Sequence, residues 1–352
     1  MSRQIADLPR AWPATGCRAE FRREVTDFRV DEVLGFALDG EGEHVFLYLE
    51  KIDLNTEEVA RRIARLADVR QMDVGFSGMK DRRAVARQWF SVYLSNRPAP
   101  DWTQLNAADL QVLEISRHRQ KLRRGQHQGN RFEIRLRDLQ GDREALEKVL
   151  TALRDQGFPN YFGEQRFGIN GANLDRAENL FRRDLRQRDR HKRGIYLSAA
   201  RSWLFNLVLA RRVAAGNWQT LIEGDLAGEV PVADWQDQRA VPTGPLYGDA
   251  PVTTEGACGE IEQAVAAAEP LFIEGLKSQR IRPERRPLVA YPMGLRWTFD
   301  AQDLTLNFAL TSGSFATALL RECGELEVNW YRAESRAGQT VTPVDEEDAE
   351  DL

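Results

Sequence analysis

The sequence has few of the residues from which metal sites and disulfide frameworks are built. Its 352 residues include only three cysteines and four histidines. Zinc sites and redox-active pairs need such residues at short, regular spacings. No CxxC pair is present, and no two histidines stand four residues apart. An enzyme built from this chain is therefore expected to work without a metal and mainly with carboxylates. The scattered residues are Cys17, Cys258, Cys323, His44, His118, His127 and His191.

Long hydrophobic runs are also missing. A membrane-spanning helix needs about 20 consecutive apolar residues, and no stretch of the chain approaches that length. The first ten residues carry charges throughout and lack the apolar segment of a secretory signal. Hydrophobic residues nevertheless make up 42% of the chain, which is enough for a substantial core. The sequence predicts a cytoplasmic protein without a membrane partner.

The charge is unevenly distributed. The net charge is −5, but residues 345–352 contribute six acids and no bases, so the rest of the chain is close to neutral. We expect residues 339–352 to form a disordered acidic tail. Residues 114–137 hold eight bases against two acids, and residues 182–193 hold seven against two. Such clusters neutralise phosphates, although a basic stretch is more often a solvated face, so charge alone only raises the expectation of an RNA partner.

The pattern of hydrophobic residues differs between the two ends of the chain and its middle. Residues 28–34 and 45–50 are predicted to be strands, and residues 131–137 alternate as a half-buried strand does; Val59, Ile63 and Leu66 instead recur at helical spacing. Asn55 and Glu58 have the spacing of a capping box for that helix, and Asp142 and Gly157 bracket a second helix. Residues 157–171 then become rich in glycine and phenylalanine, and a long helix is predicted from Ser198 to Gly216. An alternating strand at 304–310 and a helix after 312–314 return to the style of the first 150 residues.

The segment from Val74 to Val92, VGFSGMKDRRAVARQWFSV, is the most informative for chemistry. A turn marked by Gly78 presents Asp81 among the cations Lys80, Arg82 and Arg83. Neighbouring positive charge favours an ionised carboxylate, and an ionised aspartate is a usable nucleophile. The spacing by itself favours a simpler interpretation, in which Asp81 caps a helix and the arginines form its solvated face.

Several segments in order along the chain resemble the TruD family of tRNA pseudouridine synthases. The resemblance spans residues 16–323, so it does not depend on one short motif. Its most specific parts are residues 78–85 (GMKDRRAV) and residues 159–168 (PNYFGEQRFG). Further matching parts are residues 27–30 (DFRV), 40–44 (GEGEH), 121–123 (KLR), 129–130 (GN), 197–202 (LSAARS) and 313–317 (GSFAT).

The resemblance implies an enzyme that isomerises uridine 13 of tRNA to pseudouridine, without metal or cofactor and as a monomer. It places the catalytic aspartate at Asp81 and uridine contacts at Phe28, Asn130 and Phe315. A phenylalanine in an apolar pattern is usually a core residue, and an asparagine after a glycine usually serves a turn; the resemblance is what favours a substrate role. Arg22 stands where the family tends to carry a base and is a candidate partner for Asp81. Candidate contacts to the RNA backbone are Lys80, Arg82, Arg83, Lys121 and Arg123.

The implied fold is α+β. A catalytic domain with an antiparallel sheet, residues 1–156 and 289–338, is interrupted by an inserted α/β domain at 157–288. Within that insertion, residues 224–279 match the family only loosely.

Two other classes of function compete with this interpretation. A non-catalytic RNA-binding or RNA-folding protein could use the same basic segments, but it has no need of an acidic group among its phosphate contacts. A nucleic-acid hydrolase or deaminase usually needs a metal, and the sequence lacks clustered ligands for one. Activity that survives a chelator would argue against this second class.

Overall fold

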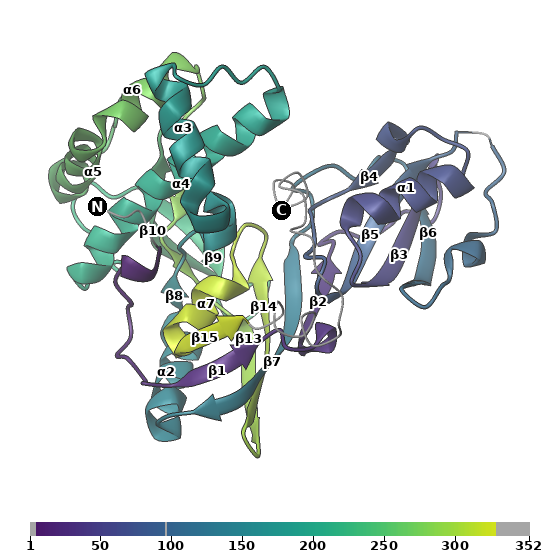
Figure 1. Cartoon of the computed structure of the whole chain (residues 1–352), viewed down its shortest axis with the longest axis horizontal. Coiled ribbons are helices and arrows are strands. Elements are labelled where there is room, and N and C mark those ends of the chain that lie inside the picture. The colour runs from purple at the N-terminus through teal and green to yellow at the C-terminus, as the bar shows by residue number, and fades with distance from the viewer. Residues whose placement is uncertain (1–4, 96, 329–352) are drawn as a thin grey trace.

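A large mixed sheet forms the centre of the computed structural model, which describes residues 5–95 and 97–328 (Figure 1). Seven strands follow the order β13-β14-β7-β2-β5-β3-β6; β1 pairs with β7 and β15, and β4 pairs with β5. The predicted acidic tail, 339–352, lies outside the described residues, as does the end of the predicted catalytic domain at 329–338. The strands of this sheet are β1 (Arg18–Phe21), β2 (Phe28–Val33), β3 (His44–Ile52), β4 (Val74–Phe76), β5 (Val85–Tyr93), β6 (Leu110–His118), β7 (Gly129–Gln140), β13 (Met293–Asp300), β14 (Asp303–Thr311) and β15 (Glu325–Val328).

Most neighbouring strands are antiparallel, which confirms the predicted α+β class. Two pairs, β2 with β5 and β1 with β15, are parallel. The chain between β2 and β5 passes through β3, α1 (Thr56–Leu66) and β4 before it returns, and parallel neighbours require such a long crossover. This crossover places the start of β5 beside the start of β2, where the chemistry-bearing segment lies.

Alternation along the strands gives the sheet one apolar and one charged face, as predicted from residues 131–137. Phe28, Ile134 and Leu306 lie in register on adjacent strands and are buried. Side chains on a strand alternate between faces, so Arg29 and Glu133 lie on the other side. The apolar face packs against α2 (Arg143–Gln156) and α7 (Ala316–Cys323) in one continuous core. Helix α1 covers the sheet around β3 and β5 through a second core that includes Val59 and Ile63.

The helix ends agree with the sequence in part. Asp142 caps α2 by accepting a bond from the Ala145 amide at 3.0 Å, and Gly157 follows its last residue, as predicted. Asn55 does precede α1, but its side chain makes no capping bond, so the predicted capping box is wrong. The long helix α4 (Arg190–Ala214) begins before Ser198, because Asp189 accepts a bond from the His191 amide at 2.7 Å and caps it there.

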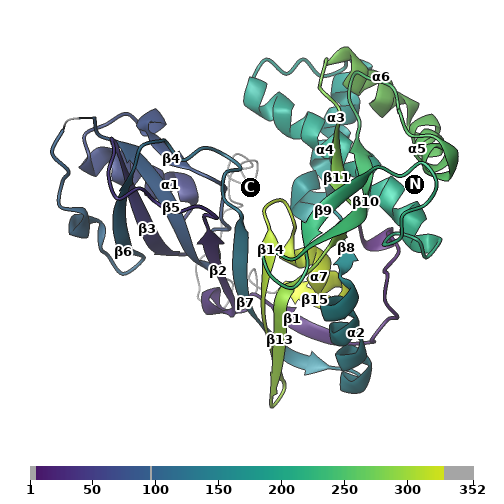
Figure 2. The ribbon, with the colours of Figure 1, turned by 180° about the vertical axis from the view of Figure 1, so that it is seen from behind.

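The segment from 157 to 288 forms a helical layer with its own small sheet (Figure 2). Its helices are α3 (Ala172–Arg182), α4, α5 (Gly256–Ala268) and α6 (Pro270–Ser278), and its sheet has the order β11-β10-β9. Strand β8 (Phe158–Pro159) pairs with β12 (Val289–Ala290), so the chain enters and leaves this segment at one place. We propose residues 157–288 as the inserted domain on this basis. Its strands are β9 (Ala227–Pro231), β10 (Gln238–Leu246) and β11 (Glu284–Pro287).

Short 3-10 turns complete the fold. Two of them, η2 (Val25–Asp27) and η5 (Glu164–Phe167), lie in or next to segments quoted above for the resemblance. The others are η1 (Ile5–Asp7), η3 (Gln71–Asp73), η4 (Trp102–Leu105) and η6 (Ile169–Gly171).

Candidate active site

Asp81 lies in the turn that joins β4 to β5. No helix follows it, because residues 82–84 lead directly into β5. The interpretation of Asp81 as a helix cap is therefore wrong. The turn is fixed from below by side chains: the Lys80 amide donates to Thr56 Oγ1 at 3.0 Å, and Thr56 Oγ1 in turn donates to Gln88 Oε1 at 3.0 Å. Gln88 Nε2 closes the network by donating to the Gly78 carbonyl.

Arg22 is the ion-pair partner of Asp81. Its Nη2 donates to Asp81 Oδ2, and the two side chains are only 12% and 23% exposed. The guanidinium also lies 4.0 Å from the centre of the Phe28 ring, a cation–π distance. Arg22 has a positive φ of 58°, which turns the chain sharply between β1 and η2. Arg22 thus joins the carboxylate to the first candidate uridine contact.

Two further contacts hold the segment around Arg22 in place. Arg137 Nη2 pairs with the buried Asp27 at 2.7 Å, and Asp27 Oδ2 accepts from the Glu24 amide at 2.8 Å. Arg83 Nη2 donates to the Arg23 carbonyl at 3.2 Å and thereby links the Asp81 turn to the same segment. The position of the ion pair is therefore set by the sheet on one side and by the turn on the other.

The segment 157–288 also reaches Asp81. Gln165, in η5, brings its Nε2 to 3.5 Å from Asp81 Oδ1. The preceding Phe162 packs against Phe315, with ring centres 5.8 Å apart. The segment identified from sequence as PNYFGEQRFG thus contacts both the carboxylate and the last candidate uridine contact.

Arg286 fixes the loop that carries Phe315. Its guanidinium donates to the Gly313 carbonyl at 2.8 Å and to Asn160 Oδ1 at 2.6 Å, and it lies 4.1 Å from the centre of the Phe162 ring. Burial lowers the pKa of Arg286 to about 9, and the positive charge of Arg166 adds to the effect. Arg286 therefore acts as a cross-link between the two segments.

Asn130 has an unused hydrogen-bond acceptor. It lies on β7 between Glu32 of β2 and Leu310 of β14, and its buried Oδ1 has no partner in the structure. Buried polar atoms are nearly always hydrogen-bonded, so an unpaired acceptor on this strand suits a ligand that donates a hydrogen bond, such as the N3–H group of uracil. Asn130 does not contact Asp81 directly. It is paired across the sheet with Glu32, and Glu32 forms an ion pair with Lys80, the residue before Asp81.

Substitution of Asn130 by alanine should slow turnover without destabilising the fold. An unsatisfied buried acceptor costs about 1–3 kcal/mol, so its removal should leave the thermal unfolding midpoint unchanged or raised. Loss of a bond to the base should lower kcat/KM by about tenfold to a hundredfold. As a control, Asn160→Ala removes bonds to Arg286 and the Pro287 carbonyl and should lower the midpoint. A destabilised Asn130→Ala protein would show that Asn130 is a structural residue.

Lys80 differs from its expected role as an RNA contact. Its ammonium lies 2.6 Å from Glu32 Oε2, and the two side chains are 5% and 0% exposed. Glu32 Oε1 also accepts from the Trp89 amide at 3.2 Å. This buried pair leaves no ammonium available to a phosphate, because Lys80 points beneath the turn. We therefore remove Lys80 from the set of RNA contacts.

The other basic candidates lie nearer the surface. Arg82 is exposed and lies 3.4 Å from Asp53, and Arg123 is exposed. Lys121 is half-buried and donates to the Met72 carbonyl, and Arg83 donates to Arg23 as described above. These four remain candidates for backbone contacts.

Sequence reasoning singled out Asp81 and Arg22 but gave no role to Gln165, Glu32 or Arg286. Gln165 lies in a segment already quoted for the resemblance, so it could have been proposed from that. Glu32 also accompanies the matching residues 27–30, but its pairing with Lys80 could not be foreseen; Arg286 has no local signal, because its partners Asn160 and Gly313 are distant in sequence.

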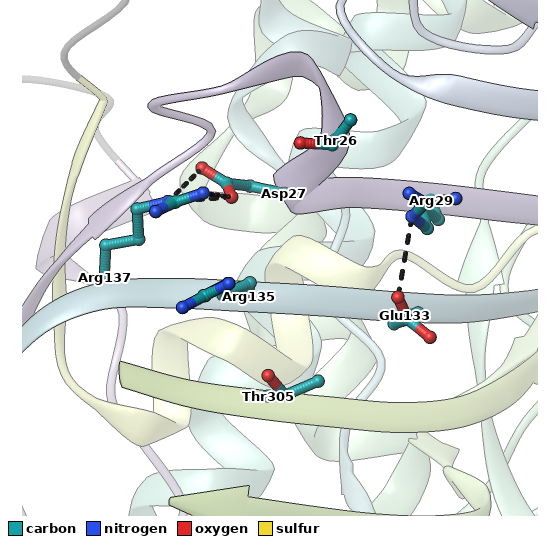
Figure 3. A pocket seen from close by; sticks show the side chains of 7 residues that line it. All are labelled: Thr26, Asp27, Arg29, Glu133, Arg135, Arg137 and Thr305. Atoms are coloured by element: carbon teal, nitrogen blue, oxygen red, sulfur yellow. Dashed lines mark hydrogen bonds and ion pairs between the residues drawn. The ribbon is translucent and has the colours of Figure 1, made fainter. Parts of the chain in front are cut away.

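A separate concavity of about 190 Å³ lies on the charged face of the sheet (Figure 3). Each arginine in it has an acidic partner: Arg29 pairs with Glu133 at 3.5 Å, Arg137 with Asp27, and Arg135 with Asp303 at 2.6 Å. Because its charges are already neutralised and it lies opposite Phe28, we do not assign it to the active site.

Among the residues that the structure describes, no group of three or more His, Cys, Asp or Glu side chains is placed to hold a metal ion. Within the same residues, every helix is too short or too polar to cross a membrane.

Comparison with known proteins agrees with the resemblance seen in the sequence. The family model for tRNA pseudouridine synthase D (TruD) matches residues 9–188 and 172–323. A tRNA pseudouridine synthase D of Ectopseudomonas mendocina (strain ymp) is 43% identical over 96% of this chain and 97% of its own length. Another, of Methylococcus capsulatus, is 44% identical over 91% and 95%.

A crystal structure from Methanosarcina mazei, described by the same family name, shares the fold. Its TM-score is 0.66 over 91% of this chain and 97% of that chain, at 22% identity. The family model covers most of the chain, and relatives more than 40% identical extend over nearly all of it. The chain therefore belongs to the tRNA pseudouridine synthase D family.

Proposed function

We propose that this protein isomerises uridine 13 of tRNA to pseudouridine, with Asp81 as the catalytic carboxylate. The observation that carries the proposal is the convergence of three distant segments around Asp81, at residues 22–28, 162–165 and 315. Arg22 pairs with its carboxylate and covers Phe28, Gln165 approaches its other oxygen, and Phe162 connects Gln165 to Phe315. The relatives named above are tRNA pseudouridine synthases, which supports tRNA as the substrate.

The reaction suits a site built around one carboxylate. The N1–C1′ bond of the uridine breaks, the uracil turns over, and a C5–C1′ bond forms; C5 then loses its proton and N1 gains one. Atoms and electrons balance, so no oxidant or co-reactant is needed. Three routes are open to the ionised Asp81 carboxylate: attack on C1′, attack on C6, or removal of a sugar proton.

The aromatic and amide side chains provide the rest of the chemistry. A uridine must leave its stack to reach Asp81, at a cost of a few kcal/mol. Phe315 is half-buried and can stack on the base, which contributes about 1–3 kcal/mol. Phe28 is buried beneath Arg22 and is better placed to form the floor of the pocket than to stack freely. The unpaired Asn130 Oδ1 can accept from the base.

A pseudouridine map of tRNA from cells that lack this protein tests the proposal. We expect pseudouridine to disappear at position 13 and to remain at every other modified position, and re-expression of the wild-type protein should restore it. Purified protein should form the same product on unmodified tRNA, and a chelator should not reduce the rate. An unchanged map would overturn the proposal.

The proposal also includes the state in which the protein acts. We propose that it works as a cytoplasmic monomer in which Asp81 receives Arg22 and Gln165 from its own chain. Equal activity across a range of protein concentrations that spans any self-association would support this. The competing function, RNA binding without catalysis, is tested by the Asp81 variant discussed below.

A further inference from the structure

Lys51 is a buried lysine whose ammonium is directed at the turn that carries Asp81. It lies on β3 and is 1% exposed. Its Nζ donates to the Leu54 carbonyl at 2.5 Å, to the Asp81 carbonyl at 2.8 Å and to the Lys80 carbonyl at 3.4 Å. A lysine ammonium has three protons and no acceptor, so the three carbonyls match its donors in number.

No carboxylate within the described part of the chain forms a salt bridge with Lys51, which makes its burial costly. A charge removed from water without a counter-ion disfavours its own ionised form. Burial accordingly lowers the pKa of Lys51 to about 8. The negative charges of Asp81 and Asp53 oppose this shift, and the positive charge of Lys80 reinforces it. An apolar side chain of similar length would fill the same space without that cost.

The hydrogen bonds of Lys51 fix the backbone on both sides of the Asp81 Cα atom. They hold the carbonyls of residues 80 and 81, while Thr56 holds the Lys80 amide from the other side. With both peptide units fixed, the Cα of Asp81 has little freedom, and its carboxylate has only its own side-chain torsions left to adjust. A displacement of about 1 Å in a reacting group can cost about a hundredfold in rate.

We propose that Lys51 is a positioning residue for the isomerisation: its ammonium fixes the backbone of Asp81 and so aims the carboxylate at the uridine. This inference rests on the proposed role of Asp81. Lys51 does not itself touch the substrate in this scheme, because it lies beneath the turn and is buried from solvent.

As pH rises through the pKa of Lys51, turnover should fall while the contribution of Lys51 to the free energy of unfolding should rise. Above about pH 8 the ammonium loses a proton, so the neutral amine has two N–H donors for three carbonyls; the turn then loosens and turnover falls. Between about pH 8 and the ordinary pKa of 10.5, the unfolded chain binds more protons at Lys51 than the folded one does. The contribution of this residue to the free energy of unfolding therefore rises with pH over the same window. A residue with only a structural role would not lower turnover while its contribution to stability rises.

The test compares Lys51→Met with wild type and with Lys148→Met, a variant of an exposed lysine on α2. We expect single-turnover rates of pseudouridine formation to fall alkaline of about pH 8 in wild type and in Lys148→Met. Lys51→Met should bind tRNA within about threefold of wild type, react about a hundredfold more slowly at pH 7.5, and show no decline near pH 8. Equal rates at pH 7.5 in Lys51→Met and wild type, or an alkaline decline that persists in the variant, would overturn the proposal.

A second measurement applies to the wild-type protein alone, in case the variant does not fold. With ¹⁵N-labelled lysine, the titration of the buried Lys51 amine should coincide with the decline in rate; separated midpoints would contradict the proposal. Failure of the proposed function looks different, because wild-type protein would then form no pseudouridine at any pH.

Discussion

Substitution of Asp81 by asparagine should abolish pseudouridine formation and leave tRNA binding intact. Asparagine has nearly the same size, but its neutral amide can neither attack a carbon nor accept the sugar proton. We expect the single-turnover rate to fall by about 10⁴-fold or more, the scale seen when a nucleophile is removed. The Kd for tRNA should be unchanged or slightly lower, because a negative charge has been removed from a surface that binds a polyanion.

A matched control lies a short distance away. Asp53 is exposed, pairs with Arg82 at 3.4 Å and faces the same turn, so Asp53→Asn makes the same chemical change outside the pocket. This variant should retain activity within a few-fold. Product formation by Asp81→Asn at a rate near that of wild type would show that the catalytic assignment is wrong. Loss of tRNA binding by that variant would instead favour a role for Asp81 in holding Arg22.

Substitution of Lys80 by methionine should produce the largest loss of stability. The change leaves the carboxylate of Glu32 fully buried without a cation. Breaking a buried ion pair by removing one partner costs about 3–5 kcal/mol, and chemical denaturation should show the free energy of unfolding reduced by that amount at pH 7.5. Burial already raises the pKa of Glu32 in the intact pair. The deficit should shrink as pH falls, because Glu32 becomes protonated and its buried charge disappears.

Two further variants separate this explanation from a simple packing defect. In Lys80→Met with Glu32→Leu, no charge remains to be desolvated, so much of the lost stability should return. Lys277→Met removes one partner of an exposed pair with Glu274 and should cost less than about 1 kcal/mol. If the double variant is as unstable as Lys80→Met, the loss comes from packing and not from the unpaired carboxylate.

The secondary structure could be predicted where the pattern is local and strong. Phe132, Ile134 and Leu136 alternate with charged residues, and the strand forms with that face inward. Asp142 and Gly157 bracket their helix as predicted. Predictions failed where tertiary contacts compete with local ones. Near Asn55 the helix forms without the capping box, and the network of Thr56 with Lys80 and Gln88 fixes the start of that helix instead.

The sequence by itself determined the family, the catalytic candidate and the alternation that gives the sheet its two faces. These depend on residue identity and short spacings, which can be read without coordinates. Arg22 could also be proposed as the partner of Asp81 from the resemblance, but only the tertiary structure decided the other neighbours of Asp81. Gln165 and Lys51 come from separate elements, and burial depends on what packs above a residue. For the same reason Lys80, which looks like an exposed base beside Asp81 in sequence, lies beneath the turn and pairs with Glu32.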